Sequence, residues 1–269
     1  CIRDRDCTAY LLGDFAFLLW DEKERMLFGA RDHFGVRPFY YHSTPGLFMA
    51  ATTIGTLLQS GISPAIDDVG MADFVAGAVA DTSGTLYRHI RRLPPGHSVL
   101  VTEGDVRIQR YWELTPQEPP PEKDWTDHFR HLFEQAVACR MADGATGALL
   151  SGGLDSSSIA MTATRIGEAQ DRPPLPSLSM TFDATPGWSD GPFIRSIVRA
   201  GRFSAQYLPS DDHDPLHDMD AMLDEQDGLY LAYNHGVSRR LYHHASRAGT
   251  TSLLDGHGGD EGVSHGFGR

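Results

Sequence analysis

The feature that most constrains the fold is an apolar run that stops at two glycines and continues as a serine-rich helix start. Residues 146–158 read TGALLSGGLDSSS. The run at 146–151 fits a buried strand, and residues 155–166 fit an amphipathic helix. A strand that turns directly into a helix is typical of a βαβ unit, so this stretch favours an α/β sheet.

The rest of the second half repeats this alternation of strands and helices. Further strands are predicted at 176–182, 204–210 and 250–256, and helices at 125–141, 191–201, about 216–226 and 235–248. On the helix at 125–141, the apolar residues on one side are Trp125, Phe129, Leu132, Phe133 and Ala136. The alternation predicts a parallel sheet with helices on both faces, where ligands sit beyond the carboxyl ends of the strands.

The first half of the chain has a different pattern. Strands are predicted at 14–21, 25–32, 37–43 and 46–52, a helix at 68–80, and a hairpin at 97–112. The segment LTPQEPPPEKD (114–124) is rich in proline and acidic residues, as extended linkers are. We therefore predict one domain over 1–113, a linker over 114–124 and a second domain over 125–269.

Composition and charge exclude several classes of protein. A formal net charge of −13 argues against a nucleic-acid partner, and no apolar run approaches the roughly 20 residues of a membrane helix. Three cysteines without metal spacing or an even count indicate a reducing cytoplasm, and no signal peptide opens the chain. The chain starts without Met and ends in SHGFGR, so we expect it to be a fragment.

The glycine turn and the helix start together predict an anion site. Glycines let a ligand approach the backbone, and the first helical turn offers unpaired N–H donors and the positive end of the helix dipole. Ser156, Ser157 and Ser158 add hydroxyl donors, so a phosphate or pyrophosphate fits best. A Walker P-loop is excluded because its lysine is absent, whereas a serine-capped helix without a ligand stays open as the alternative.

A second motif follows about one hundred residues later. LLDGHGGDEGVSHG (253–266) again ends a strand in a glycine-rich loop, and it carries Asp260 and Glu261. Two loops at strand ends of one parallel sheet can face each other across one crevice, where carboxylates would suit Mg²⁺. An acidic surface turn is the alternative.

The pattern S-G-G-x-D-S-S resembles the pyrophosphate loop of the PP-loop ATP pyrophosphatases. Together with the second motif it is similar to the synthetase domain of the asparagine synthetase family. In the first half, GDFAFLLWD and LFGARDHFGVRPFYY resemble the later part of that family's class II glutaminase domain. The resemblance implies an α/β two-domain chain: a partial, Ntn-type α+β glutaminase-like domain, then a parallel-sheet ATP pyrophosphatase domain truncated at its C-terminus.

The resemblance also implies roles for residues of the two loops. The pyrophosphate loop would be lined by Ser151, Gly152, Gly153, Asp155, Ser156 and Ser157. Leu149 and Met180 match positions that touch the adenosine of ATP, and Asp255 and Gly256 match a Ser-Gly that borders the nucleotide. Asp155 and Asp260 match positions that hold Mg²⁺.

Two departures from the family pattern bear on the chemistry. His257 stands where the family has an acidic residue that takes part in forming the acyl-adenylate and in ammonia attack. A histidine there could act as a base, bind a different acceptor, or simply be tolerated. Cys1 is not expected to be a glutaminase nucleophile, because it lies only a few residues before GDFAF and IRDRDC does not match the family's start.

Three functions remain in competition. The first is an ATP-dependent, glutamine-hydrolysing asparagine synthetase that adenylates aspartate, releases pyrophosphate and lets ammonia from glutamine displace AMP. The second is a lasso-peptide cyclase-like enzyme, whose acceptor and amine both belong to a precursor peptide. The third is a non-catalytic nucleotide-binding remnant, which the intact SGGLDSS and GGDE motifs argue against. A homodimer is one assembly that we consider.

Overall fold

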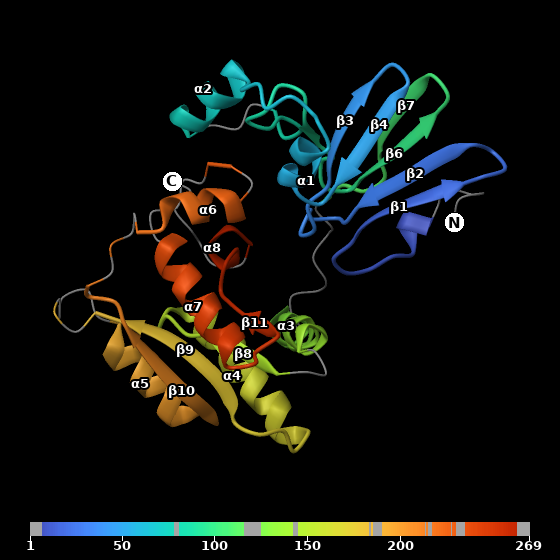
Figure 1. Ribbon diagram of the computed structural model, residues 1–269. Helices are drawn as coiled ribbons and strands as arrows, with labels where there is room; N and C mark the ends of the chain where they lie inside the picture. The colour runs from blue at the N-terminus through green and yellow to red at the C-terminus, as the bar shows by residue number, and fades with distance from the viewer. Residues whose placement is uncertain are drawn as a thin grey trace. The chain divides into compact units, whose positions relative to one another are not determined.

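The computed structural model describes residues 7–77, 81–115, 125–141, 145–182, 184, 190–212, 214, 217–226, 228–229 and 235–262. The chain forms two compact units (Figure 1). One comprises Cys1–Gln117 with Met219–Leu231, and the other Glu118–Asp218 with Ala232–Arg269. Most of the predicted linker at 114–124 lies outside the described residues. Within the described part of the chain, no helix is both long enough and apolar enough to cross a membrane.

The first unit contains two antiparallel sheets. A four-stranded sheet has the order β1 (Ala16–Asp21), β2 (Met26–Arg31), β6 (His97–Thr102) and β7 (Asp105–Arg110). A three-stranded sheet has the order β4 (Leu47–Ala51), β3 (Tyr40–Thr44) and β5 (Arg91–Arg92). The strands predicted in this half are therefore confirmed, and β5 was not predicted.

Three helices and a short 3-10 turn, η1 (Cys7–Ala9), complete this unit. The helices are α1 (Ile54–Gln59), α2 (Asp68–Ala76) and α6 (Met219–Glu225). Helix α2 begins where the Asp67 carboxylate accepts the Gly70 N–H at 2.9 Å, and it ends where Gly77 adopts a left-handed φ of 64°. The sequence predicted a helix at about 216–226 as part of the second domain, whereas α6 groups with the first unit.

A buried charged pair fixes the loop after β2. Asp32 is 1% exposed, and its carboxylate accepts the N–H groups of Val36 at 2.9 Å and Arg37 at 2.8 Å. The Arg31 guanidinium donates to three backbone carbonyls in return, those of Gly35, Arg37 and Leu93. Burial, and then the charge of Arg92, lower the pKa of Arg31 from its ordinary value.

Tyr111, the residue directly after β7, completes this network. Its hydroxyl donates to the backbone carbonyl of Arg31 at 2.6 Å. Burial first, and the charge of Asp32 second, raise the pKa of Tyr111 to about 12.

The second unit is built on one parallel sheet. Its strand order is β10 (Phe203–Pro209), β9 (Leu175–Thr181), β8 (Thr146–Leu149) and β11 (Ser252–Leu254), and all three pairings are parallel. The helices are α3 (Trp125–Arg140), α4 (Leu154–Ala169), α5 (Gly191–Ala200), α7 (His235–Arg247) and α8 (Gly259–Gly262). The predicted α/β fold with a parallel sheet is confirmed.

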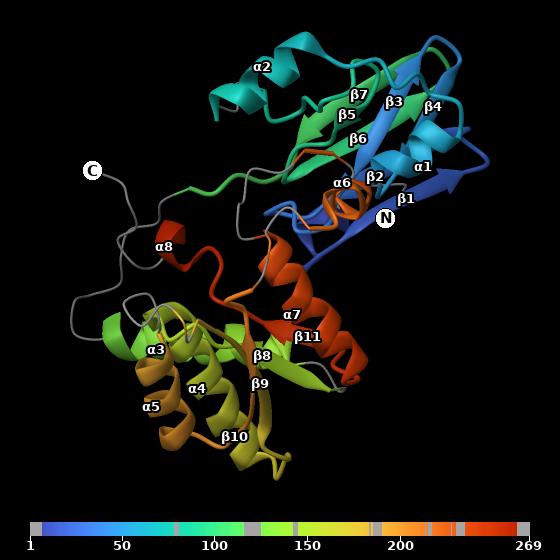
Figure 2. The same ribbon diagram turned by 60° about the vertical axis from the view of Figure 1, so that its left-hand side comes forward.

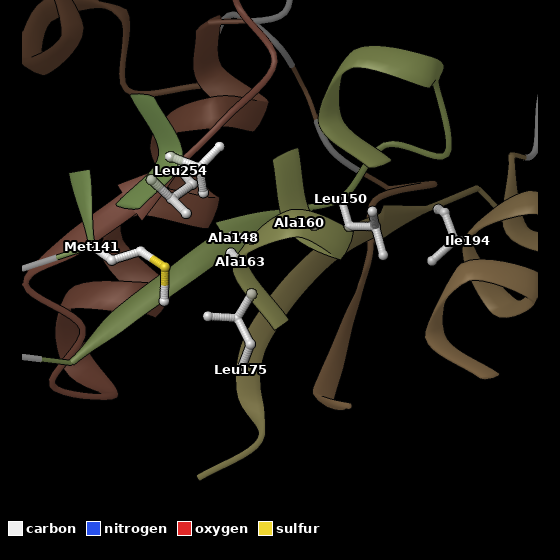
Figure 3. Packing of buried hydrophobic residues seen from close by; sticks show 9 residues of the cluster. Met141, Ala148, Leu150, Ala160, Ala163, Leu175, Ile194 and Leu254 are labelled. Carbon is white, nitrogen blue, oxygen red and sulfur yellow. The ribbon is translucent and has the colours of Figure 1, made fainter. Parts of the chain in front are cut away.

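Helices cover both faces of this sheet (Figure 2). On one face, Val137 of α3, Ala160 and Ala163 of α4 and Ile194 of α5 pack with strand residues; Figure 3 shows this cluster. On the other face, Leu241 and Ala245 of α7 pack against Leu178 of β9. Both faces therefore exclude water, as the continuous apolar strand runs predicted.

The residue that helix α3 buries most deeply is not one of those predicted to form its apolar side. Val137 is 5% exposed and lies in the core, and Phe133 packs partly against it. Trp125, Phe129 and Leu132 are 46%, 50% and 50% exposed. The apolar side thus packs on the sheet only at the C-terminal half of the helix.

Candidate functional site

The first loop lies between β8 and α4. Leu150, the first residue after β8, is 1% exposed, and Gly152 then turns the chain with a φ of +89°. Helix α4 begins after Gly153, whose position as N-cap supplies no side-chain hydrogen bond. As a glycine, Gly153 offers the first-turn N–H donors of α4 no capping side chain of its own, which suits an anion.

Serine hydroxyls shape this loop in two different ways. Ser156 is buried, and its Oγ lies 2.9 Å from Ser151 Oγ and accepts the Ser151 N–H at 3.3 Å, so it holds the turn together. The Ser157 Oγ is buried and has no hydrogen-bond partner among the described residues. Of these two hydroxyls, only that of Ser156 therefore holds the turn.

The second loop follows β11 and is organised by Asp255. Its Oδ1 accepts the backbone N–H of His257 at 3.0 Å, and its Oδ2 lies 3.2 Å from His257 Nδ1. The Asp255 side chain is 32% exposed and that of His257 is 71% exposed. Asp255 therefore holds both the backbone and the ring of a histidine that faces solvent.

The glycines of the second loop lie against Asp155 and Ser156 at the start of α4. A methyl group on Gly256 would lie 2.8 Å from the Ser156 backbone nitrogen, and one on Gly259 would lie 2.6 Å from Asp155 Oδ2. Neither position accommodates a side chain without movement of the first loop, which explains why glycines surround His257. The second loop therefore lies directly against the start of α4.

A cavity of about 490 Å³ lies at this junction. Its walls include most of the predicted site residues, namely Leu149, Ser151, Gly153, Asp155, Ser156, Met180, Asp255, Gly256, His257 and Asp260. The predicted residues Gly152 and Ser157 do not line it. The volume is within the range of small-ligand sites in proteins.

The cavity also has walls that sequence reasoning missed. Asp190, immediately before α5, and Ser238, on α7, both line it. Neither lies in a glycine-rich motif, and each reaches the cavity because its helix packs on the sheet beside the site. The position of Asp190 after strand β9 is the one signal that could have found it, since that strand end faces the same edge.

Four aspartates line the cavity, and two of them are the predicted metal ligands. Asp155 and Asp260 both line it, and among the described residues no three His, Cys, Asp or Glu side chains cluster closely enough to hold a metal. Mg²⁺ is commonly bound by one or two carboxylates, with substrate phosphates and water as its other ligands. Asp155 and Asp260 fit that mode of binding.

Both halves of the chain match known families. Residues 3–112 match a glutamine amidotransferase domain, and residues 128–266 match asparagine synthase. The chain is 31% identical to asparagine synthetase [glutamine-hydrolyzing] 3 of Bacillus subtilis, over 72% of this chain and 34% of the relative.

Two further relatives align along nearly the whole chain. A putative asparagine synthetase [glutamine-hydrolyzing] 2 of Methanocaldococcus jannaschii is 28% identical, over 95% of this chain and 50% of the relative. Amidase chyE of Penicillium rubens is 27% identical, over 94% of this chain and 40% of the relative. The chain thus spans half or less of the length of these relatives.

Proposed function

The chain belongs to the asparagine synthase family, and on that premise we propose that it activates a carboxylate with ATP and converts it to an amide. A carboxylate oxygen would attack the α-phosphorus of ATP, and the bond to the bridging oxygen of the β-phosphate would break, releasing pyrophosphate. An amine would then displace AMP from the acyl-adenylate and lose a proton as the amide forms. We call the first loop, between β8 and α4, the serine loop, and residues 256–259 of the second loop the GHGG loop. The observation that carries this proposal is the direct contact between these two loops beside one cavity.

Each wall of the cavity has a role in this proposal. The N–H groups at the start of α4 would bind the departing pyrophosphate, whose charge they stabilise. Leu149 and Met180 would pack against the adenosine, and Gly256 would border the nucleotide. Asp155 and Asp260 would hold Mg²⁺, which would neutralise phosphate charge when bound.

His257 is proposed to take the proton that the amine loses. Asp255 engages its Nδ1 and its backbone N–H, which leaves Nε2 as the nitrogen able to accept a proton. The carboxylate would also stabilise the imidazolium that forms, as carboxylates paired with catalytic histidines do. This arrangement supports a catalytic role in place of the family's acidic residue.

The amine is proposed to be ammonia from glutamine, supplied by the amidotransferase half in the whole protein. The chain matches that domain over residues 3–112. Cys1 lies outside the described residues and is given no role. Aspartate is the first acceptor to test.

The test is ATP–pyrophosphate exchange by the full-length protein with aspartate. Aspartate-dependent exchange is expected, and Asp155→Ala should abolish it because the loop carboxylate is lost. Glu168→Ala is a matched control, since Glu168 is exposed at the other end of the same helix. Exchange at the wild-type rate in Asp155→Ala would show that the loop assignment is wrong.

A second candidate is macrolactam formation on a precursor peptide, as in lasso-peptide cyclases. The specific observation in its favour is His257, whose loop departs from the synthetase pattern. Exchange stimulated by a peptide carboxylate and not by aspartate would favour this candidate. A protein that binds ATP but gives no exchange with either would favour the nucleotide-binding remnant.

A further inference from the structure

A second cavity, of about 620 Å³, adjoins the nucleotide cavity within the same unit. The two cavities share Asp155 and the backbone of Gly256, His257 and Gly258 as lining residues. The GHGG loop is therefore a common wall, and a molecule in the second cavity lies against the residues proposed to handle the reacting groups.

The walls of this second cavity are mainly apolar. Phe129 and Phe133 of α3 line it, and their rings stack with centroids 5.8 Å apart and planes inclined by 24°. Ile159 and Met161 of α4 line it from the neighbouring helix. Such a surface binds an aromatic or aliphatic group by excluding water.

The exposure of Phe129 indicates that this cavity is not simply part of the core. Phe129 is 50% exposed, whereas Val137, two turns later on the same helix, is 5% exposed and belongs to the core cluster. Leaving a phenyl ring half in water forgoes about 1 kcal/mol of the hydrophobic free energy that full burial would give. A ligand that covers it recovers this free energy.

Two arginines add positive charge beside the apolar walls. Arg130 pairs with Asp127 at 3.0 Å and Arg165 with Glu134 at 3.6 Å, and both guanidinium groups remain more than half exposed. The cavity therefore combines an apolar surface with two arginines, each of which already has a carboxylate partner. Free aspartate has no apolar group to occupy such a surface.

We propose that this second cavity binds the body of the carboxylate acceptor, and that the acceptor carries an aromatic or aliphatic group beside its reactive carboxylate. The inference rests on the proposed function and names the substrate class of that site. The nucleotide occupies the first cavity, so the acceptor reaches the GHGG loop from the second. The chemistry itself is unchanged, because only the body of the acceptor differs from aspartate.

The first test compares three probes in ATP–pyrophosphate exchange by the full-length protein: L-phenylalanyl-L-aspartate, L-alanyl-L-aspartate and free L-aspartate. Burial of a phenyl group predicts a KM for the phenylalanyl peptide roughly 10-fold below that of the alanyl peptide. If free aspartate stimulates exchange to the same extent as the phenylalanyl peptide, this inference is overturned and the proposed function still stands. No exchange with any of the three counts against both.

The second test uses Phe129→Ala with Trp125→Ala as its matched control. Trp125 is on the same helix and 46% exposed, but it does not line the cavity. Phe129→Ala should raise the KM for the phenylalanyl peptide about 10-fold while the KM for ATP stays unchanged, and Trp125→Ala should change neither. A lower melting temperature with an unchanged KM would show that the protein itself covers Phe129, which overturns the proposal.

Discussion

Gly259→Ala is the sharpest probe of the contact between the two loops. The added methyl group would lie 2.6 Å from Asp155 Oδ2 and closer still to the carboxyl carbon, whereas ordinary contacts begin near 3.4 Å. To relieve its nearest contact, the carboxylate or the loop must therefore move by about 1 Å. A displacement of about 1 Å at a reacting site costs about 100-fold in rate, or about 2.7 kcal/mol of transition-state stabilisation.

The assay is ATP–pyrophosphate exchange, measured beside thermal unfolding. Gly249→Ala is the control, because Gly249 has a φ of +80° and open space around it in the turn before β11. It should lose about 1–2 kcal/mol of stability to backbone strain and keep its exchange rate. Gly259→Ala should show the reverse, a large loss of exchange with a small loss of stability. Exchange in Gly259→Ala within twofold of the wild type would refute the contact.

Three further predictions concern the buried network of the first unit and the histidine of the second. Between pH 10 and about 12 the free energy of unfolding should fall as pH rises, because only the unfolded state loses the Tyr111 proton there. Urea denaturation at several pH values should show a smaller fall in Tyr111→Phe, and an equal dependence of the unfolding free energy on pH in both proteins would contradict this. Asp32→Ala should cost about 3 kcal/mol in urea denaturation, because it removes the acceptor of the Val36 and Arg37 N–H groups and the negative charge beside buried Arg31. A cost below about 1 kcal/mol would count against it. Asp255→Ala should release the ring of His257 from its carboxylate partner. The rate of amide formation with ammonia should then fall about 10-fold more than the rate of hydroxamate formation with hydroxylamine, which is unprotonated at neutral pH. An equal loss of rate with both amines would argue for a merely structural role.

The parallel sheet and its two loops could be predicted from the sequence because their signals are local. Each strand is a continuous apolar run, and each loop begins with glycine at the point where the run ends. The elements that were missed carry no such signal. Strand β5 is two arginines that pair with Tyr40 and Tyr41, and helix α1 has six residues, too few to display a helical period.

The candidate site could be predicted only in part, for a related reason. Residues within the two motifs line the cavity, but Asp190 and Ser238 reach it from helices whose position depends on packing across the sheet. Likewise, the spacing of Trp125 and Phe129 places them on one side of α3, but spacing alone does not say how far the sheet extends beneath them. Where a side chain meets another part of the chain, only the tertiary structure identifies the partner.

The pairing of β11 with β8 makes the site a late product of folding. Ser252 lies opposite Thr146, so the GHGG loop reaches the serine loop only after about one hundred intervening residues have been placed. Contacts between such distant segments form slowly, because the chain loses the entropy of the whole loop before it gains the contact. A ribosome-bound chain that has emerged only as far as α7 would have its serine loop but not the glycines that lie against it. Under the proposed function, nucleotide affinity would report whether the sheet is complete, and an ATP analogue added during refolding would trap only chains in which β11 has docked.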